Sequence, residues 1–194
     1  MLDRIGGEIA RATTIVRFAK GSSFSAHTHG GGEEFIVLEG VFQDESGDFP
    51  AGSYVRNPPT SHHTPASEPG CTIFVKLWQM DTDDRRQMSV DINSIDLQPA
   101  RGRSGVTSAI LYRGANEVVR VEHWAPGTMI TLPLPGGAEI LTLEGGFSEH
   151  GETFTRQSWL RLPTCDTLSA EAGPDGAKIW IKEGHLARTP KPPA

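Results

Sequence analysis

The sequence has few of the features that mark several large classes of protein. It contains only two cysteines, Cys71 and Cys165, which form no Cys-x-x-Cys pair and are too few for a disulfide framework. No apolar run approaches the roughly 18 residues of a membrane-spanning helix, and residues 1–20 lack the apolar core of a signal peptide. Lysine and arginine do not cluster, and the formal net charge is -6. We therefore expect a cytoplasmic protein with no membrane and no nucleic-acid partner.

Glycine and proline are abundant, by contrast, with 22 and 14 residues. Charged residues make up 22% and hydrophobic residues 37%, which is close to ordinary globular usage. This composition is typical of short strands joined by tight turns, and no segment shows the periodicity of a long helix. The sequence therefore predicts an all-β fold.

The sequence also repeats itself with an offset of about 105 residues. Each matching segment consists of apolar and β-branched residues and ends near a glycine or proline turn. Three pairs of segments match: 34–42 with 139–147, 53–58 with 158–163, and 73–76 with 179–182. Repeated short strands of this kind predict two closed or double-sheet antiparallel barrels, one in residues 1–100 and the second in residues 101–194.

Four potential metal ligands occur in the first copy. His27 and His29 are two residues apart, so on a strand they project to the same face. The glycines 30–32 allow a tight turn, after which the Glu33 carboxylate can return to the same centre, and His63 completes the set from a distant strand. Three imidazoles and one carboxylate suit zinc or iron, with manganese or nickel as alternatives, and they leave room for water or substrate. We expect one divalent metal ion per chain.

Two of these ligand choices have a neighbouring competitor. Glu34 follows Glu33 directly, and only the spacing to the next glycine turn favours Glu33. His62 precedes His63, and only the spacing from the preceding prolines favours His63. No general acid or base stands out beside the ligands, so no catalytic residue is assigned.

The second copy lacks every one of these ligands. When the copies are aligned with one glycine missing from the turn, the four positions fall on Pro133, Pro135, Ala138 and Leu168. None of these side chains can bind a metal, so we expect the second barrel to be a metal-free structural partner. The remaining histidines outside the pattern are interpreted as surface residues: His123, His150 and His185.

The spacing of the ligands resembles the two sequence motifs of the cupin superfamily. In this sequence they read Gly21-x5-His27-x-His29-x3-Glu33-x6-Gly40 and Gly52-x5-Pro58-x4-His63. Thr60 and Ser67 stand where the second motif usually has glycine and asparagine. Segments 27–40, 54–59 and 70–77 further resemble the ChrR-like cupin family, which includes the cupin domain of zinc-dependent anti-sigma factors.

The resemblance implies a bicupin, with two double-stranded β-helix (jelly-roll) barrels in tandem, and it places the family's four metal ligands on His27, His29, Glu33 and His63. It implies a metal-binding protein that acts on a small-molecule substrate, with dioxygenase-like or related chemistry. The alternative is a ChrR-like sensor module that binds zinc or a small ligand without catalysis. Nothing here matches the sigma-binding N-terminal domain, so sigma binding is not implied. We expect the two barrels to pair within one chain, which leaves a homodimer open.

Overall fold

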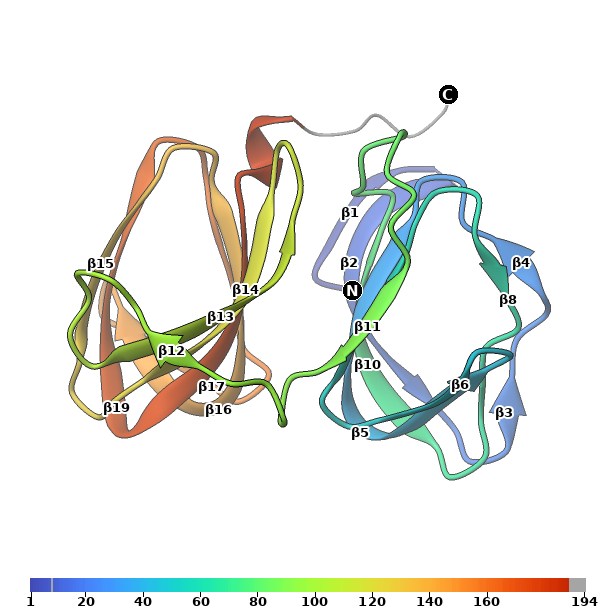
Figure 1. Cartoon of the computed structure of the whole chain (residues 1–194), viewed down its shortest axis with the longest axis horizontal. Coiled ribbons are helices and arrows are strands. Elements are labelled where there is room, and N and C mark those ends of the chain that lie inside the picture. The colour runs from blue at the N-terminus through green and yellow to red at the C-terminus, as the bar shows by residue number, and fades with distance from the viewer. Residues whose placement is uncertain (8, 189–194) are drawn as a thin grey trace. The chain divides into compact units, whose positions relative to one another are not determined.

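The computed structural model describes residues 1–7 and 9–188, and it divides into two compact units (Figure 1). The first unit is built on Met1–Ser94, and the second begins at Ile95. Nearly all regular structure is β-strand, and the one helix in the described part is the 3₁₀ turn η1 (His185–Ala187). Among the described residues, no helix is long and apolar enough to cross a membrane.

The first unit is a curled antiparallel sheet in the order β1-β2-β10-β5-β7-β11, with β6, β9 and β3 continuing from it and β4 pairing with β8. Its strands are β1 (Asp3–Gly6), β2 (Ala10–Phe18), β3 (Ser22–Ser23), β4 (His27–Thr28), β5 (Glu33–Asp44), β6 (Gly47–Pro50), β7 (Ser53–Asn57), β8 (His62–His63), β9 (Ala66–Ser67), β10 (Cys71–Leu77) and β11 (Met88–Asp91).

The second unit repeats this plan in the order β12-β13-β14-β19-β16-β17, with β15 paired to β19 and β18 paired to β16. Its strands are β12 (Gln98–Pro99), β13 (Val106–Arg113), β14 (Val118–Trp124), β15 (Met129–Leu134), β16 (Ala138–Glu149), β17 (Glu152–Thr155), β18 (Trp159–Leu162) and β19 (Asp166–Glu183). The prediction of an all-β chain with two tandem barrels is confirmed.

The longest strand of the first barrel, β5, has 12 residues and serves two parts of the sheet. Its first half pairs with β10 and β7, and its second half pairs with β6. It bends at Gly40, which has a φ of 72°. A Cβ atom there would lie 1.9 Å from the carbonyl oxygen of Gly70, so only glycine permits the strands to approach this closely. Gly145 holds the same position in β16, with a φ of 63°.

Alternation along the strands fills each barrel with apolar side chains. In β5, Phe35 and Val37 point into the core of the first unit, where Phe42 and Val55 join them. The core of the second unit is larger and includes Trp124. Tight packing of this kind fixes the register of the strands, and thereby the positions of the polar residues at their ends.

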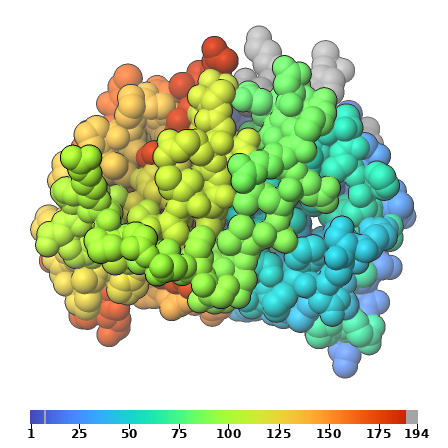
Figure 2. All heavy atoms as spheres, in the orientation of Figure 1, coloured from blue at the N-terminus to red at the C-terminus, as the bar shows by residue number. Residues whose placement is uncertain are grey.

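A buried carboxylate on β14 ties the second unit together. Glu122 accepts two hydrogen bonds from Arg103, at 2.6 and 2.8 Å, and one each from Arg120 and Trp124, both at 2.7 Å. The segment between β12 and β13, which carries Arg103, lies at the surface of the unit (Figure 2). Burial alone would raise the pKa of Glu122, but its hydrogen bond to Arg103 and the charge of Arg120 outweigh burial and lower that pKa.

Replacing this carboxylate should change how stability depends on pH. A lowered pKa in the folded state contributes stability that is complete above the usual value of 4.5 and is lost as the pH falls through the lowered value. Glu122→Gln should therefore destabilise the chain by about 3 kcal/mol at neutral pH, because it removes the carboxylate that pairs with Arg103 and one of the two carboxylates that pair with Arg120.

Urea unfolding of the full chain at several pH values measures both effects. The stability of the variant should fall less steeply than that of the wild type below pH 4.5. Glu152→Gln, at an exposed position of β17, is the matched control and should leave the profile unchanged. Equal pH slopes for Glu122→Gln and the wild type would contradict the assigned cause.

Candidate metal centre

Strands β4 and β8 lie side by side in the first unit (Figure 1). Three histidines meet at this pair. His27 lies directly opposite His63 in this pairing, and His29 follows two residues later. One ring nitrogen from each of the three lies within 4.8 Å of the others, a spacing that could hold a metal ion. His29 and His63 are buried, whereas His27 is exposed, so the group can be reached from solvent.

Hydrogen bonds orient two of these rings. Nδ1 of His27 lies 2.9 Å from the carbonyl oxygen of Ser25, and Nδ1 of His63 lies 3.0 Å from Oδ2 of Asp44. Carbonyl and carboxylate oxygens accept hydrogen bonds, so in each case Nδ1 carries the proton and donates it. In the neutral ring the Nε2 atom then presents a lone pair, as a metal ligand requires.

Glu33 brings a carboxylate to the same place. It is the first residue of β5, and its Oε2 lies 3.5 Å from Nε2 of His29 and 3.6 Å from Nε2 of His63. The Asn57 amide donates a hydrogen bond of 3.1 Å to the same oxygen. We call His27, His29, Glu33 and His63 the His3Glu cluster.

The structure separates Glu33 from its competitor Glu34. Glu34 points to the opposite face of β5, where it accepts hydrogen bonds from the Tyr54 hydroxyl at 2.8 Å and from Arg56 at 2.9 Å. The carboxylate of Glu34 therefore forms a buried ion pair with Arg56, away from the histidines. His62 is exposed and His63 is buried, as expected for neighbours that alternate along β8. The geometry therefore favours Glu33 and His63 as ligands.

Burial and neighbouring charges shift the pKa values of three residues of the cluster. Burial, with further contributions from the charges of His63 and His27, lowers the pKa of His29 to about 3, so His29 is neutral. Burial also raises the pKa of Glu33, and the charge of His63 offsets this only in part. Burial alone would lower the pKa of His63, but its hydrogen bond to Asp44 and the negative charges of Glu33, Asp44 and Glu45 together outweigh burial and raise that pKa.

The donor set fits a divalent metal ion. The Nε2 atoms of His29 and His63 are buried and have no hydrogen-bond partner, which is costly for polar atoms unless something binds them. A cation between these nitrogens and Oε2 of Glu33 would satisfy all of them at once. Three imidazoles and one carboxylate are a ligand set used by zinc, iron, manganese and nickel.

The corresponding place in the second unit is apolar. Leu132 lies opposite Leu168 in the β15–β19 pairing, as His27 lies opposite His63 in the first unit. Leu134 is also buried in the core there. Leucine offers no ligand atom, so this barrel has a packed core where the first has its histidines.

This register corrects one detail of the sequence alignment, which placed Pro133 and Pro135 at the histidine positions. Both prolines are exposed, and the leucines beside them point inward. The carbonyl of Leu134 accepts a hydrogen bond from the Cys165 amide, just as the carbonyl of His29 accepts one from the Thr60 amide. The turn that contains the glycines therefore has the same length in both copies. The first copy is one residue longer than the second, and this extra residue lies between β3 and β4.

Sequence reasoning also missed three residues. Asp44 and Asn57 contact the His3Glu cluster from the far end of β5 and from the end of β7, where no short-range spacing marks them. His185 was interpreted as a surface residue, but it is buried, with its Nε2 atom 3.6 Å from the carboxylate of Glu139. Only the strand register brings these groups together.

Comparison with known proteins agrees with this architecture. Residues 1–81 match the ChrR Cupin-like domain, a span that includes the whole His3Glu cluster. A search of curated protein sequences finds no match.

Solved structures of the same fold are distant in sequence. A putative dioxygenase from Nostoc punctiforme matches with a TM-score of 0.78 at 15% identity, over 95% of this chain and 73% of that one. Salicylate 1,2-dioxygenase from Pseudaminobacter salicylatoxidans matches with a TM-score of 0.67 at 12% identity, over 90% and 71%. Oxalate decarboxylase from Lactobacillus farciminis matches with a TM-score of 0.66 at 10% identity, over 98% and 84%. These likenesses establish the cupin fold.

We expect close to one metal ion per chain, because the one group of three clustered metal-binding side chains in the described residues lies in the first unit. Elemental analysis of the purified chain measures this ratio. The double variant His27→Ala with His63→Ala should bind no metal, whereas His123→Ala, an exposed position on β14, should bind as the wild type does. A ratio near two ions per chain would refute the prediction.

The two adjacent glutamates give a sharper test. Glu33→Gln should weaken metal binding at least about tenfold, because a neutral amide replaces a charged ligand. Glu34→Gln should leave metal affinity unchanged but lower thermal stability, because it disrupts the buried pair with Arg56. Competition with a chromophoric chelator measures affinity, and thermal unfolding measures stability. The reverse pattern would identify Glu34 as the ligand.

Proposed function

We propose that the first unit, which has the cupin fold, binds one divalent metal ion in the His3Glu cluster and acts as a small-molecule metalloenzyme with dioxygenase-like chemistry. The observation that carries the proposal is the pair of buried, unpartnered Nε2 atoms that face Oε2 of Glu33. Bound iron would supply a redox centre for oxygen chemistry, and bound zinc would supply a Lewis acid.

The residues around the cluster hold its ligands in place. Asp44 keeps the proton of His63 on Nδ1, so that Nε2 faces the centre. The side-chain amide of Asn57 donates a hydrogen bond to Oε2 of Glu33 and so fixes its carboxylate. Gln87 in turn donates a hydrogen bond of 3.4 Å to the side-chain oxygen Oδ1 of Asn57. Such partners tune metal sites, and their loss typically costs about 10–100-fold in affinity or activity.

Exposure of one ligand supports a catalytic role. His27 is exposed, whereas the other three residues of the cluster are buried, so a small substrate can approach from the side of His27. A reactive metal site needs such an open side, whereas a purely structural site is closed by its protein ligands. Two of the three solved structures described above have dioxygenase names, which supports the class of chemistry proposed.

A regulatory role is the second candidate, and the match of residues 1–81 to the ChrR cupin-like domain favours it. In that case the cluster would hold zinc tightly and respond to a ligand or an oxidant without turnover. The metal held and the consumption of oxygen distinguish the two roles.

The test measures metal content and oxygen uptake together. We expect the chain, purified without added metal, to contain iron and, after loading with Fe(II), to consume oxygen in the presence of a small dicarbonyl or enol substrate. His27→Ala should abolish the uptake while leaving the fold intact, because its side chain is exposed. His62→Ala, the same change at the exposed residue of β8, is the matched control.

Two results would overturn the enzymatic proposal. One is tightly held zinc, together with no oxygen uptake by the iron-loaded chain for any of the dicarbonyl and enol substrates tested. This result would favour the regulatory role. The other is uptake that is identical in the wild type and in His27→Ala, which would place the chemistry outside the cluster.

A further inference from the structure

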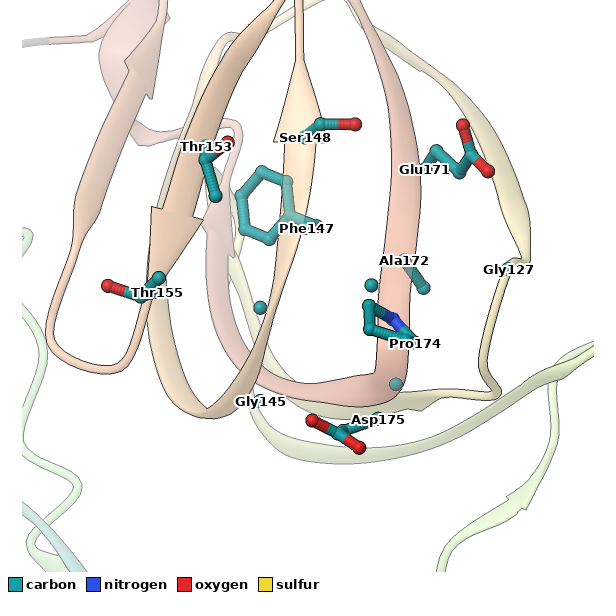
Figure 3. A pocket seen from close by; sticks show the side chains of 13 residues that line it. Gly127, Gly145, Phe147, Ser148, Thr153, Thr155, Glu171, Ala172, Pro174 and Asp175 are labelled. Atoms are coloured by element: carbon teal, nitrogen blue, oxygen red, sulfur yellow. The ribbon is translucent and has the colours of Figure 1, made fainter.

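The second unit carries a groove of about 670 Å³, and none of the four residues of the His3Glu cluster lines it (Figure 3). It crosses three neighbouring strands in the order β17, β16, β19. Figure 3 shows polar side chains around it: Thr153 and Thr155 from β17, Ser148 from β16, and Glu171 from β19.

The same place in the first unit is filled by the chain itself. Gln43 lies at the centre of the equivalent surface, with its Nε2 atom donating to Oδ1 of Asp48 at 2.8 Å. Its Oε1 atom accepts a hydrogen bond of 2.7 Å from the backbone amide of Glu68. One carboxamide therefore bridges two neighbouring strands and covers the surface between them.

In the second unit the residues at these positions are smaller. Ser148 pairs with Thr153 in β16 and β17, as Gln43 pairs with Asp48 in β5 and β6. At the position equivalent to Glu68 the second unit has Gly173. The bridging carboxamide is therefore missing, and on the other side of Ser148 the carboxylate of Glu171 stands where the first unit has the methyl group of Ala66.

Chain packing does not require the small side chain of Ser148. Gly145 and Gly146 do have a steric reason, because a Cβ atom would lie 2.1 Å from the Gly176 carbonyl oxygen and 2.7 Å from the Phe154 carbonyl oxygen, respectively. Ser148, by contrast, is partly exposed on a regular part of β16, where a glutamine is accommodated in the first unit. The two units therefore differ at this position in the size of the side chain and not in the path of the backbone.

The lining of the groove defines the ligand it suits. Three hydroxyl groups and two carboxylates, those of Glu171 and Asp175, can accept hydrogen bonds, and no lysine, arginine or histidine lines the groove. Phe147, Ala172 and Pro174 contribute apolar side chains to the lining. An anion would be repelled, whereas a sugar ring offers hydroxyl donors at its edge and C–H groups on its face.

We propose that this groove binds a neutral saccharide of one or two rings, whose hydroxyl groups take the place that the Gln43 carboxamide has in the first unit. The volume falls within the range of roughly 300–1,000 Å³ that is typical of small-molecule sites. The site lies wholly in the second unit and does not depend on the metal centre.

The experiment is an amide NMR titration of the full chain with maltose and cellobiose as probes. We expect saturable shifts with at least one of them, at a Kd of about 1 mM, confined to residues of β16, β17 and β19 that line the groove. Glucose 6-phosphate, the anionic counterpart, should bind at least about tenfold more weakly, because the two carboxylates repel it.

Ser148→Gln tests the site directly, because it restores the side chain that fills the first unit. It should reduce binding at least about tenfold without changing the rest of the spectrum. Thr131→Gln, at an exposed position of β15 outside the groove, is the matched control and should bind normally. No shifts with either disaccharide at about 50 mM, shifts confined to other surfaces, or unchanged binding in Ser148→Gln would each overturn the proposal.

Discussion

The close approach of the backbone at Gly40 to the carbonyl oxygen of Gly70 is the constraint on which the first unit depends. It lets β5 bend, so that one strand contributes residues to the same centre from both of its ends. Glu33, the first residue of the strand, faces Nε2 of His63, and Asp44, the last, bonds to Nδ1 of the same ring. A straight strand of this length would hold these two carboxylates far apart on opposite sides of the barrel.

Much of this could be predicted from sequence because the informative signals are short. The histidine pair and the glycine turn each span a few residues, and the internal repeat can be found by comparing the two halves. These signals predict two all-β barrels and the histidine pair that joins His63 in the first. Asp44, Asn57 and the burial of His185 could not be predicted, because each depends on strand register between distant segments. The misplaced prolines have the same cause, since a one-residue shift moves a side chain to the other face.

The two units show how one backbone plan supports different interiors. In the first, polar groups converge inside the barrel, whereas in the second, leucines fill the same region. Each unit nevertheless has a buried ion pair on the strand that follows the glycine turn, Glu34 with Arg56 at 2.9 Å and Glu139 with Arg161 at 3.1 Å. The shared plan therefore includes a charged pair on β5 and β16 as well as turns and apolar residues, and the histidines are an addition specific to the first unit.

The rings of His27 and His63 are held by hydrogen bonds of different kinds, so mutation affects the two rings differently. The ring of His63 is held by the side chain of Asp44, so a substitution of Asp44 can alter both the basicity of the ring and its affinity for a metal ion. The ring of His27 is held by the main-chain oxygen of Ser25, which every amino acid at that position would also provide. Natural variation or engineering can thus adjust the centre gradually through the interior of the barrel, while its solvent-facing side stays fixed by the path of the chain.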